Sequence, residues 1–459
     1  MIKIFKQLGR HWAACLAVVA LLVVQAYCDL SLPDYTSKIV DVGIQQGGIE
    51  SPVPDTVRDT TLQALTLLMS EEDATLAEQW YSDPDADGLR TLSSDADTAM
   101  TELESAFTTP DIVLYMAAAK NASEQAGTTD TVTPTTYDLD AVATQFSAMA
   151  QAPGAREMLQ TQLASAISSL DESVADSLSS QAMLLVALEY DAQGIAHDVQ
   201  MRYLLHTGGE MLALTLLMVA VAIAVGFIAS RVSASIGRDL RREVFSTVVG
   251  YSNAEIEKFS TASLITRTTN DIQQVQFVCV ILLRMVSYAP ILGIGGILHV
   301  ASGNTGLEWI IFVAVAALLV LIIFLMNVAL PKFKQMQTLV DRLNLVSREI
   351  LTGIMPIRAF SRERFEEERF DKANTDLMKT QLFTNRTMVA MMPFMTLIMN
   401  GTSLLIVWFG GKAMDLGTMQ VGEMIAFNTY TRQIVMSFLK LSMVAVMLPR
   451  AGVAADRID

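Results

Sequence analysis

The chain has 459 residues, of which 52% are hydrophobic and only 17% charged. A soluble domain carries about 25% charged residues, so this composition excludes an ordinary soluble protein and indicates one embedded in lipid. The net charge of −16 is uneven: residues 50–200 hold 26 acidic and four basic residues, and the remainder is net basic. The chain is therefore a basic membrane protein interrupted by an acidic block.

The first predicted element is an uncharged apolar run over residues 11–28. A helix needs roughly 20 apolar residues to cross a bilayer. Lys3, Lys6 and Arg10 precede the run, as they would in a cleaved signal peptide. The run is long for a signal peptide and no clear cleavage site follows it. We therefore expect residues 1–48 to hold a first transmembrane helix and its outer extension.

Residues 49–202 form a predicted acidic insert, rich in Ala, Ser, Thr, Asp and Leu. Apolar residues recur every three or four positions in residues 62–68 and 159–170, which predicts amphipathic helices. Breaks rich in Pro, Gly or Thr at residues 82–88, 127–136 and 151–154 divide these helices. About 150 residues suffice to bury a core. The three cysteines all lie in apolar segments outside the insert, so a disulfide framework is excluded there.

Residues 83–88 of the insert, DPDADG, copy the first half of a calcium-binding loop. Asp83, Asp85 and Asp87 occupy the first three ligand positions, but Ser94 stands where the loop needs a bidentate glutamate. We therefore predict a solvated turn rather than a metal site. No arrangement of residues indicates a catalytic site in the chain.

Four further uncharged runs cover residues 211–230, 285–307, 309–331 and 387–411, and a sixth apolar segment spans residues 421–449. Only Glu308 separates the third run from the fourth, which predicts a tight hairpin turning at residues 303–306. The predicted fold is all-α: a polytopic membrane protein with six transmembrane helices, of which helices 2–6 lie in residues 203–459.

Basic residues predict the orientation in the membrane. Residues 231–276 hold six and residues 332–386 hold eleven, whereas the short turns near Gly303 and Lys412 hold at most one. Both basic connections, and with them both termini, are predicted to be cytoplasmic and the insert extracytoplasmic. The basic connections have helical patterns, so we expect two helical hairpins that each reach about 35 Å or more into the cytoplasm.

Three segments resemble signatures of ABC exporters. Residues 257–271, EKFSTASLITRTTND, are similar to the first intracellular loop, with its pattern Gly-x-Leu-x-Ser-Arg-x-x-Asn-Asp, although Ala262 or Ser263 replaces the glycine. Residues 348–363, REILTGIMPIRAFSRE, resemble the second loop, and residues 447–458, MLPRAGVAADRI, the end of the sixth helix. The resemblance covers residues 1–48 and 203–459, and residues 341–411 are closest to bacterial multidrug exporters that work as heterodimers.

The resemblance implies a type IV exporter fold, in which two membrane halves exchange helices around a central cavity. It also implies short coupling helices at the hairpin tips, near residues 259–265 and 359–365, that dock on nucleotide-binding domains. The alternative is that these segments pack only within their own hairpins. The coupling residues predicted in this way are Phe259, Ser260, Thr261, Ser263, Leu264, Arg358, Phe360, Ser361, Arg362, Glu363 and Phe365.

Ionisable residues inside a spanning helix cost about 2.5–3.5 kcal/mol at mid-membrane, so they usually contact a cavity or a partner. We expect a cavity-facing role for Arg432 rather than an ion pair with a partner subunit, and an interfacial position for Lys440. Methionines on the fifth and sixth helices suit a surface that binds varied apolar ligands. They could instead pack against neighbouring helices, and the two roles are compatible because each helix has several faces. The predicted substrate-pathway residues are Met392, Met395, Met399, Asn400, Arg432, Met436 and Lys440.

The 459 residues contain no phosphate-binding loop. The pair Gly411-Lys412 is followed by Ala413 rather than Ser or Thr, and Ile406 stands where the first glycine should be. We expect this chain to bind no cofactor. Mg-ATP is then implied on a nucleotide-binding domain that belongs to another chain or to a part removed by truncation.

The leading hypothesis is a subunit of an ATP-driven exporter in the bacterial plasma membrane, moving amphipathic compounds or peptides outward by alternating access. Its expected partners are a second exporter half, identical or different, and nucleotide-binding domains; no nucleic acid is expected. One alternative is a sensor or scaffold derived from an exporter half, which presents the insert outside the cell. A channel is a third possibility.

Overall fold

The computed structural model describes residues 8–126, 139–150, 175–252, 261–302, 306–416 and 418–458. The predicted helix break at residues 127–136, the one at 151–154 and the helix at 159–170 lie outside these ranges, as do Phe259, Ser260 and most of the turn at 303–306. Backbone contacts group the chain into two compact units. One comprises Met1–Ala26, Val221–Val407 and Tyr430–Asp459, and the other comprises Tyr27–Ala220 and Trp408–Thr429.

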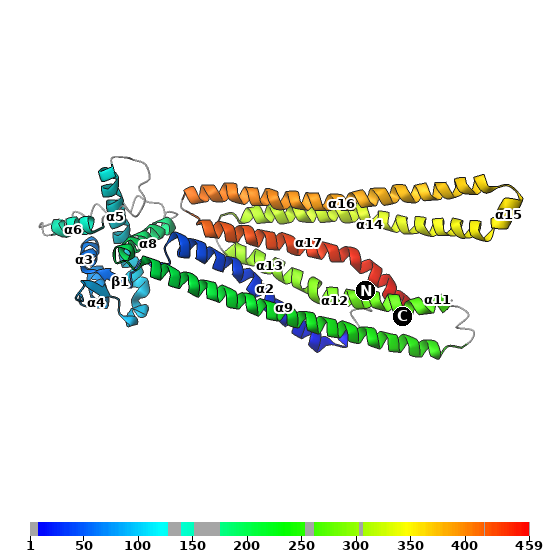
Figure 1. The fold of residues 1–459 in the computed structure, drawn as a ribbon, viewed down its shortest axis with the longest axis horizontal. Coiled ribbons are helices and arrows are strands. Elements are labelled where there is room, and N and C mark those ends of the chain that lie inside the picture. The colour runs from blue at the N-terminus through cyan, green and yellow to red at the C-terminus, as the bar shows by residue number, and fades with distance from the viewer. Residues whose placement is uncertain are drawn as a thin grey trace. The chain divides into compact units, whose positions relative to one another are not determined.

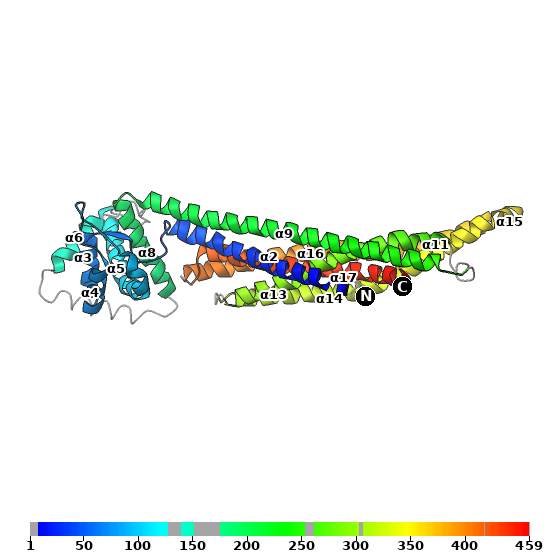
Figure 2. The ribbon, with the colours of Figure 1, turned by 90° about the horizontal axis from the view of Figure 1, so that it is seen from below.

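Long helices dominate the part of the chain that resembles an exporter (Figure 1 and Figure 2). The chain begins with α2 (Trp12–Lys38), which continues into a π-helix η1 (Ile39–Gln45). After the insert, α9 (Ala196–Val249) extends over 54 residues, or about 81 Å. The following helices are α11 (Thr261–Thr266), η5 (Arg267–Asp271), α12 (Ile272–Ile281), η6 (Leu282–Val286), α13 (Ser287–Ser302), α14 (Glu308–Thr352), α15 (Ile354–Ala359), α16 (Glu363–Asp415) and α17 (Val421–Ile458).

Within the described residues, five helical segments are long and apolar enough to cross a membrane. They are Trp12–Gln45, Ala196–Val249, Ser263–Ala301, Glu308–Thr352 and Glu363–Asp415. Each of them overlaps one of the first five predicted spans, and α9, α14 and α16 continue far beyond the apolar runs, as the sequence predicts. The sixth predicted span lies within α17, a helix of 38 residues. The number of spans and their orientation stay predictions.

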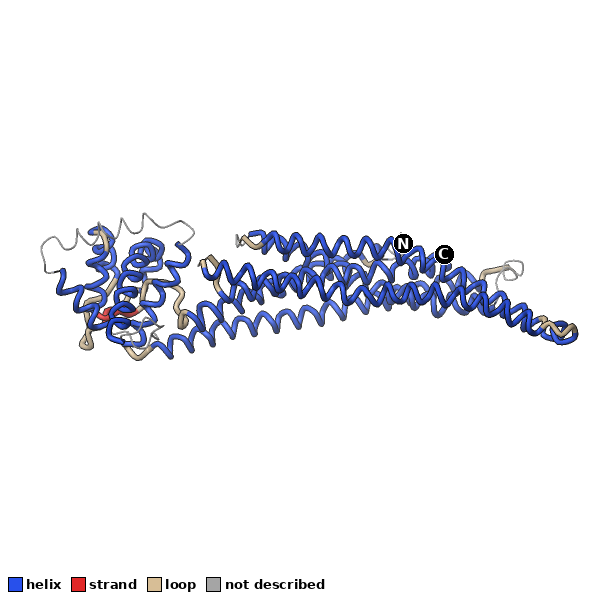
Figure 3. Tube along the Cα trace, turned by 90° about the horizontal axis from the view of Figure 1, so that it is seen from above, coloured by secondary structure: helices blue, strands red, loops and turns tan. Residues whose placement is uncertain are grey.

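The insert is mostly helical, with α3 (Asp59–Leu68), α4 (Glu71–Trp80), η2 (Ser94–Ala99), α5 (Met100–Ala126), α6 (Leu139–Ala150) and α8 (Ala175–Ala192). The prediction of an all-helical insert needs a correction, because β1 (Thr56–Arg58) and β2 (Leu89–Thr91) form an antiparallel ribbon (Figure 3). Val57 pairs with Arg90 at its centre. Strands of three residues are too short to show an alternating pattern in the sequence.

The acidic turn before β2 is the segment that resembles half a calcium loop. Asp85 Oδ1 accepts hydrogen bonds from the N–H groups of Asp87 and Leu89, both at 2.9 Å. Gly88 has a φ of +75°, which glycine adopts at low cost. Asp85 therefore supports the turn that leads into the ribbon. In the described part of the chain, no group of three or more His, Cys, Asp or Glu side chains is arranged to hold a metal ion.

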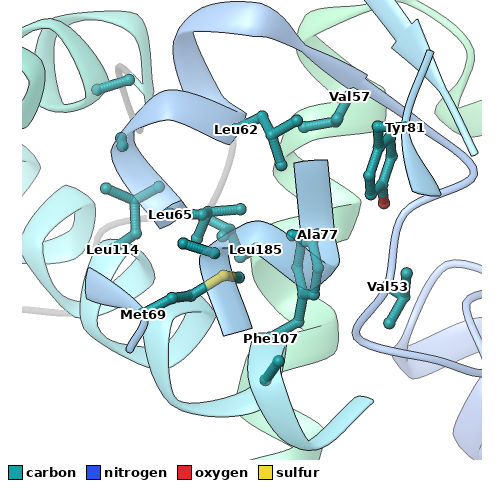
Figure 4. Packing of buried hydrophobic residues seen from close by; sticks show 14 of the residues in the cluster. Val53, Val57, Leu62, Leu65, Met69, Ala77, Tyr81, Phe107, Leu114 and Leu185 are labelled. Carbon is teal, nitrogen blue, oxygen red and sulfur yellow. The ribbon is translucent and has the colours of Figure 1, made fainter. Parts of the chain in front are cut away.

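The insert has a hydrophobic core of its own (Figure 4). The apolar face of α3, with Leu62 and Leu65, packs there with Phe107 and Leu114 of α5 and Leu185 of α8. These five side chains are almost fully buried. The three- and four-residue spacing that predicts an amphipathic helix at residues 62–68 is thus confirmed by its buried face.

A charged network joins the start of the insert to α8. Arg58 forms a bidentate ion pair with Glu189, with both N···O distances at 3.0 Å. Glu189 is almost completely buried and also accepts hydrogen bonds from the Arg58 N–H at 2.8 Å, the Thr61 hydroxyl at 2.9 Å and the Gln193 amide at 2.9 Å. Asp140 of α6 pairs with the same guanidinium. These bonds satisfy the charges that folding removes from water.

Asp111 of α5 is a buried carboxyl group of a different kind. It is fully buried, and neither of its oxygens has a hydrogen-bond partner among the described residues. Burial raises the pKa of Asp111 well above its ordinary value. The folded insert therefore retains a proton that the unfolded chain releases near pH 4, and its stability falls as the pH rises from about 4 toward the raised pKa.

We expect Asp111→Asn to remove most of this pH dependence, which amounts to about 1.4 kcal/mol for each unit by which the pKa is raised. The insert of the variant should be the more stable one at neutral pH, because an amide has no charge to bury. Hydrogen exchange of α5 in the whole protein, corrected for intrinsic rates, measures this between pH 5 and pH 8. The exposed Asp95→Asn serves as the control. An unchanged pH slope in Asp111→Asn would contradict the assignment.

The insert leaves the first helix and returns to α9 at neighbouring points. Gly48 has a φ of +84°, and a Cβ at this position would lie only 2.9 Å from Gln200 Cα. The Gln200 side-chain amide donates a hydrogen bond to the Gly43 carbonyl oxygen at 2.9 Å. The close approach therefore requires glycine at residue 48. The hydrogen bond and this contact hold the C-terminal end of the first helix against the start of α9.

The first helix also contacts the start of the last one. Asp41, which is buried in η1, accepts hydrogen bonds from the Gly422 N–H at 2.6 Å and from the Ser37 hydroxyl at 2.9 Å. Gly422 is the second residue of α17, so the carboxylate satisfies an unpaired N–H and complements the dipole at the helix start. A Cβ at residue 422 would lie 2.6 Å from the Ser37 carbonyl oxygen, so this contact needs glycine.

Candidate functional site

The second basic connection is a helical hairpin formed by α14, α15 and α16 (Figure 1). Gly353 ends α14, and its N–H donates to the Glu349 carbonyl oxygen at 2.9 Å. Pro356 lies in the first turn of α15, where a missing N–H is tolerated. Further from the tip, Arg369 of α16 forms ion pairs with Glu349 of α14 and, at 3.2 Å, with Glu366 of α16. The tip is therefore a short, separate helix between two legs joined by an ion pair.

A left-handed residue closes the tip. Ser361 has a φ of +50°, its N–H donates to the Arg358 carbonyl oxygen at 3.2 Å, and the Arg362 N–H donates to the Ile357 carbonyl oxygen at 2.9 Å. This is the Schellman pattern of helix ends, with serine at the position that usually holds glycine. The motif stops α15 after Ala359 and lets α16 begin at Glu363.

We expect Ser361→Gly to stabilise the tip by about 1 kcal/mol, because glycine adopts positive φ without steric cost. Ser361→Val should destabilise it, since a β-branched residue avoids this region. Hydrogen exchange of residues 354–362 in the whole protein measures both effects. Ser347→Gly, in the regular part of α14, should lower the stability of its helix, whereas Ser361→Gly should raise that of the tip. Equal signs for the two glycine variants would contradict the role assigned to Ser361.

The tip exposes large apolar side chains. Phe360 is 79% exposed, Met355 75% and Leu351 74%, and Phe365 is also exposed. The Arg362 guanidinium lies 6.0 Å from the centre of the Phe365 ring. A groove of about 470 Å³ runs beside them, and it is lined by Ser347, Ile350, Leu351, Ile354, Ile357, Arg358, Glu363, Glu366, Glu367 and Phe370. An apolar centre with a charged rim is the composition of a protein-binding surface.

The first predicted coupling segment is described only in part. Thr261 begins α11, and Ser263 and Leu264 are half-buried on it. The helix continues through the π-helix η5, in which Asp271 is buried. Nearby, α9 lies close to α12: the Ser233 hydroxyl donates a hydrogen bond to the Gln276 carbonyl oxygen at 2.5 Å.

The predicted substrate-pathway residues divide into two groups. Met395 of α16 is buried with Leu318 of α14 and Val435 of α17, and Met399 packs against this cluster. These two methionines take the packing role that the sequence left open. The Lys440 ammonium lies 5.2 Å from the centre of the Tyr288 ring on α13. The interfacial position of Lys440 stays a prediction.

The other group is exposed in this single half. Met392 and Asn400 of α16 are exposed, and so are Arg432 and Met436, which lie one turn apart on α17. Within the described residues, Arg432 forms no ion pair. The sequence alone could not separate Met395 from Met392, because both lie in the same methionine-rich run.

Long apolar helices with extended hairpins are the architecture of a transporter's membrane domain. Residues 164–438 match the family model of the ABC transporter transmembrane region, and the chain belongs to this family.

Its curated relatives are named as components of ABC transporters. An uncharacterized ABC transporter ATP-binding protein of Mycobacterium tuberculosis is 38% identical over 251 residues, which are 55% of this chain and 43% of the relative. The uncharacterized ABC transporter ATP-binding protein YfiB of Bacillus subtilis is 31% identical over 275 residues, 60% of this chain and 48% of the relative. ABC transporter B family member 1 of Dictyostelium discoideum is 23% identical over 222 residues, 48% of this chain and 24% of the relative. The chain thus matches less than half the length of these relatives.

Proposed function

We propose that this chain is the membrane-spanning subunit of an ATP-driven exporter in a bacterial plasma membrane. It moves amphipathic compounds or peptides outward by alternating access, and a nucleotide-binding domain outside these 459 residues binds Mg-ATP and hydrolyses it. A second membrane half, identical or different, completes the cavity. The observation that carries the proposal is the exposed apolar tip of the hairpin between α14 and α16.

The tip suits a coupling role for two reasons. Its apolar residues Leu351, Met355 and Phe360 are exposed on a connection whose basic residues predict a cytoplasmic position, where a protein partner can reach them. The tip is also joined to both legs of the hairpin, because Arg369 of α16 pairs with Glu349 of α14 and the Schellman closure leads directly from α15 into α16. Movement of a domain docked on the tip is therefore transmitted along α14 and α16 into the membrane.

The substrate pathway in this proposal includes Met392, Asn400, Arg432 and Met436, which are exposed on α16 and α17. A charged Arg432 in a membrane helix is costly unless it contacts water, a ligand or a partner. The exposed methionines supply a polarisable, adaptable surface for apolar ligands.

The test is purification of the chain from its native membrane, with mass spectrometry of the proteins that co-purify and an ATPase assay of the eluate. The proposal expects an ABC ATPase or a second exporter half, with activity that responds to added hydrophobic compounds. Recovery of the chain alone without ATPase activity would contradict the proposal and favour a sensor that acts through its insert.

A further inference from the structure

A cavity of about 580 Å³ lies where the insert meets the outer ends of the first two helices. Its wall consists of Lys38 at the end of α2, residues between Gly48 and Asp55, Tyr190 of α8, and residues of α9 between Val199 and Glu210. All of them belong to one compact unit. The volume lies in the range of small-molecule sites, about 300–1,000 Å³.

Two cations in this wall have no acidic partner. Among the described residues, neither Lys38 nor Arg202 forms an ion pair. The Lys38 ammonium lies 5.7 Å from the centre of the Tyr35 ring, and Arg202 interacts electrostatically with Tyr190. Burial raises the pKa of Tyr190 to about 12, so this phenol is neutral at neutral pH and leaves the Arg202 charge uncompensated. The cavity therefore offers positive charge to an anionic group.

The same wall also carries carboxylates. They are Glu50, Asp55 and Glu210. Glu50 interacts with the Tyr203 phenol, Asp55 interacts with Tyr190, and Glu210 lies 3.8 Å from His206 Nδ1. The wall thus presents both signs of charge, so it complements a zwitterion better than a simple anion or cation.

The cavity lies at the predicted outer surface of the membrane. Glu210, which lines the cavity, directly precedes the apolar run that begins at Met211. The α9 wall of the cavity therefore ends where the predicted hydrocarbon begins, which is where lipid head groups lie.

We propose that this cavity binds the head group of a zwitterionic lipid, in which a phosphate diester is joined to an ammonium, as in phosphatidylethanolamine. Lys38 and Arg202 bind the phosphate, for which the arginine offers two parallel donors. Glu50 and Glu210 bind the ammonium, and an acyl chain lies beside the apolar run of α9 that follows Glu210. The site is independent of the proposed export function, because it needs no ATP and no second half.

The test measures binding of short-chain phosphatidylethanolamine to the purified whole protein in detergent. Short-chain phosphatidylglycerol, which lacks the ammonium, is measured in parallel. We expect Arg202→Gln to weaken binding of both lipids by about tenfold or more, since a hydrogen bond to a charged group is lost. Glu50→Gln should weaken binding of phosphatidylethanolamine only. Arg241→Gln, at the far end of α9, is the matched control and should bind both lipids as the wild type does.

Water-soluble competitors distinguish a lipid from a free head group. O-phosphoethanolamine and inorganic phosphate should displace the lipid only weakly, because neither carries an acyl chain. Displacement by either one at the concentration of the lipid would overturn the assignment to a lipid. Equal binding by the wild type and Arg202→Gln would overturn the site itself. Lys38→Gln provides a second variant with the same expectation, and a melting temperature like that of the wild type shows that each variant is folded.

Discussion

Phe360→Ala is expected to abolish ATP-coupled transport while the protein remains inserted in the membrane. The side chain is 79% exposed at the hairpin tip and contributes little to packing within the chain. Its loss therefore acts on docking rather than on folding. An aromatic anchor at the centre of an interface contributes about 2 kcal/mol or more, which corresponds to roughly thirtyfold weaker docking.

The measurement is ATP-dependent uptake into inside-out vesicles, together with co-purification of the ATPase. Arg362→Glu should give the same loss, because it reverses a charge beside the Phe365 ring. Phe245→Ala is the matched control, since Phe245 is also an exposed phenylalanine, at 65%, and lies on the part of α9 that extends beyond the apolar run. Wild-type coupling in both tip variants would refute the docking role.

Glu189→Ala is expected to destabilise the insert by about 3 kcal/mol, because it removes the buried acceptor of several hydrogen bonds and leaves the half-buried Arg58 guanidinium with only the exposed Asp140 as an acidic partner. Arg58→Met should cost a similar amount. The double variant with Glu189→Leu should cost less than the sum of the two, because no uncompensated charge then remains. Hydrogen exchange of α3 and α8 in the whole protein measures the change.

The control is Arg90→Met, which breaks the pair between Arg90 and Asp59. That pair is more exposed than the pair of Arg58 with Glu189, so its loss should cost about 1 kcal/mol or less. Equal losses in Arg90→Met and Glu189→Ala would show that the buried network has no special role in the stability of the insert.

The long helices were predictable because the need to cross hydrocarbon leaves a continuous apolar run in each segment. A membrane helix must present about 20 apolar residues in sequence, and this pattern is local. The resemblance predicted a short helix at the hairpin tip near residues 359–365, whereas α15 covers Ile354–Ala359 and α16 begins at Glu363. The left-handed Ser361 between them was not predictable, because serine gives no sign of positive φ. The ribbon of β1 and β2 was missed because its strands have only three residues each.

Pairs of residues far apart in the chain could not be predicted from one sequence. Arg58 and Glu189 are separated by 131 positions, and Asp41 and Gly422 by 381. Each residue alone looks like a solvated surface group or an ordinary helix residue. Only the fold shows that both carboxylates are buried and that each satisfies a specific donor.

The contact between Gly48 and Gln200 bears on how a transporter membrane domain can carry a large inserted domain. The chain leaves the first helix and reaches α9 at nearly the same place, so the insert spans no distance that a short turn could not also span. Inserted domains of different size can therefore be exchanged at this junction without changing the spacing of the first two helices.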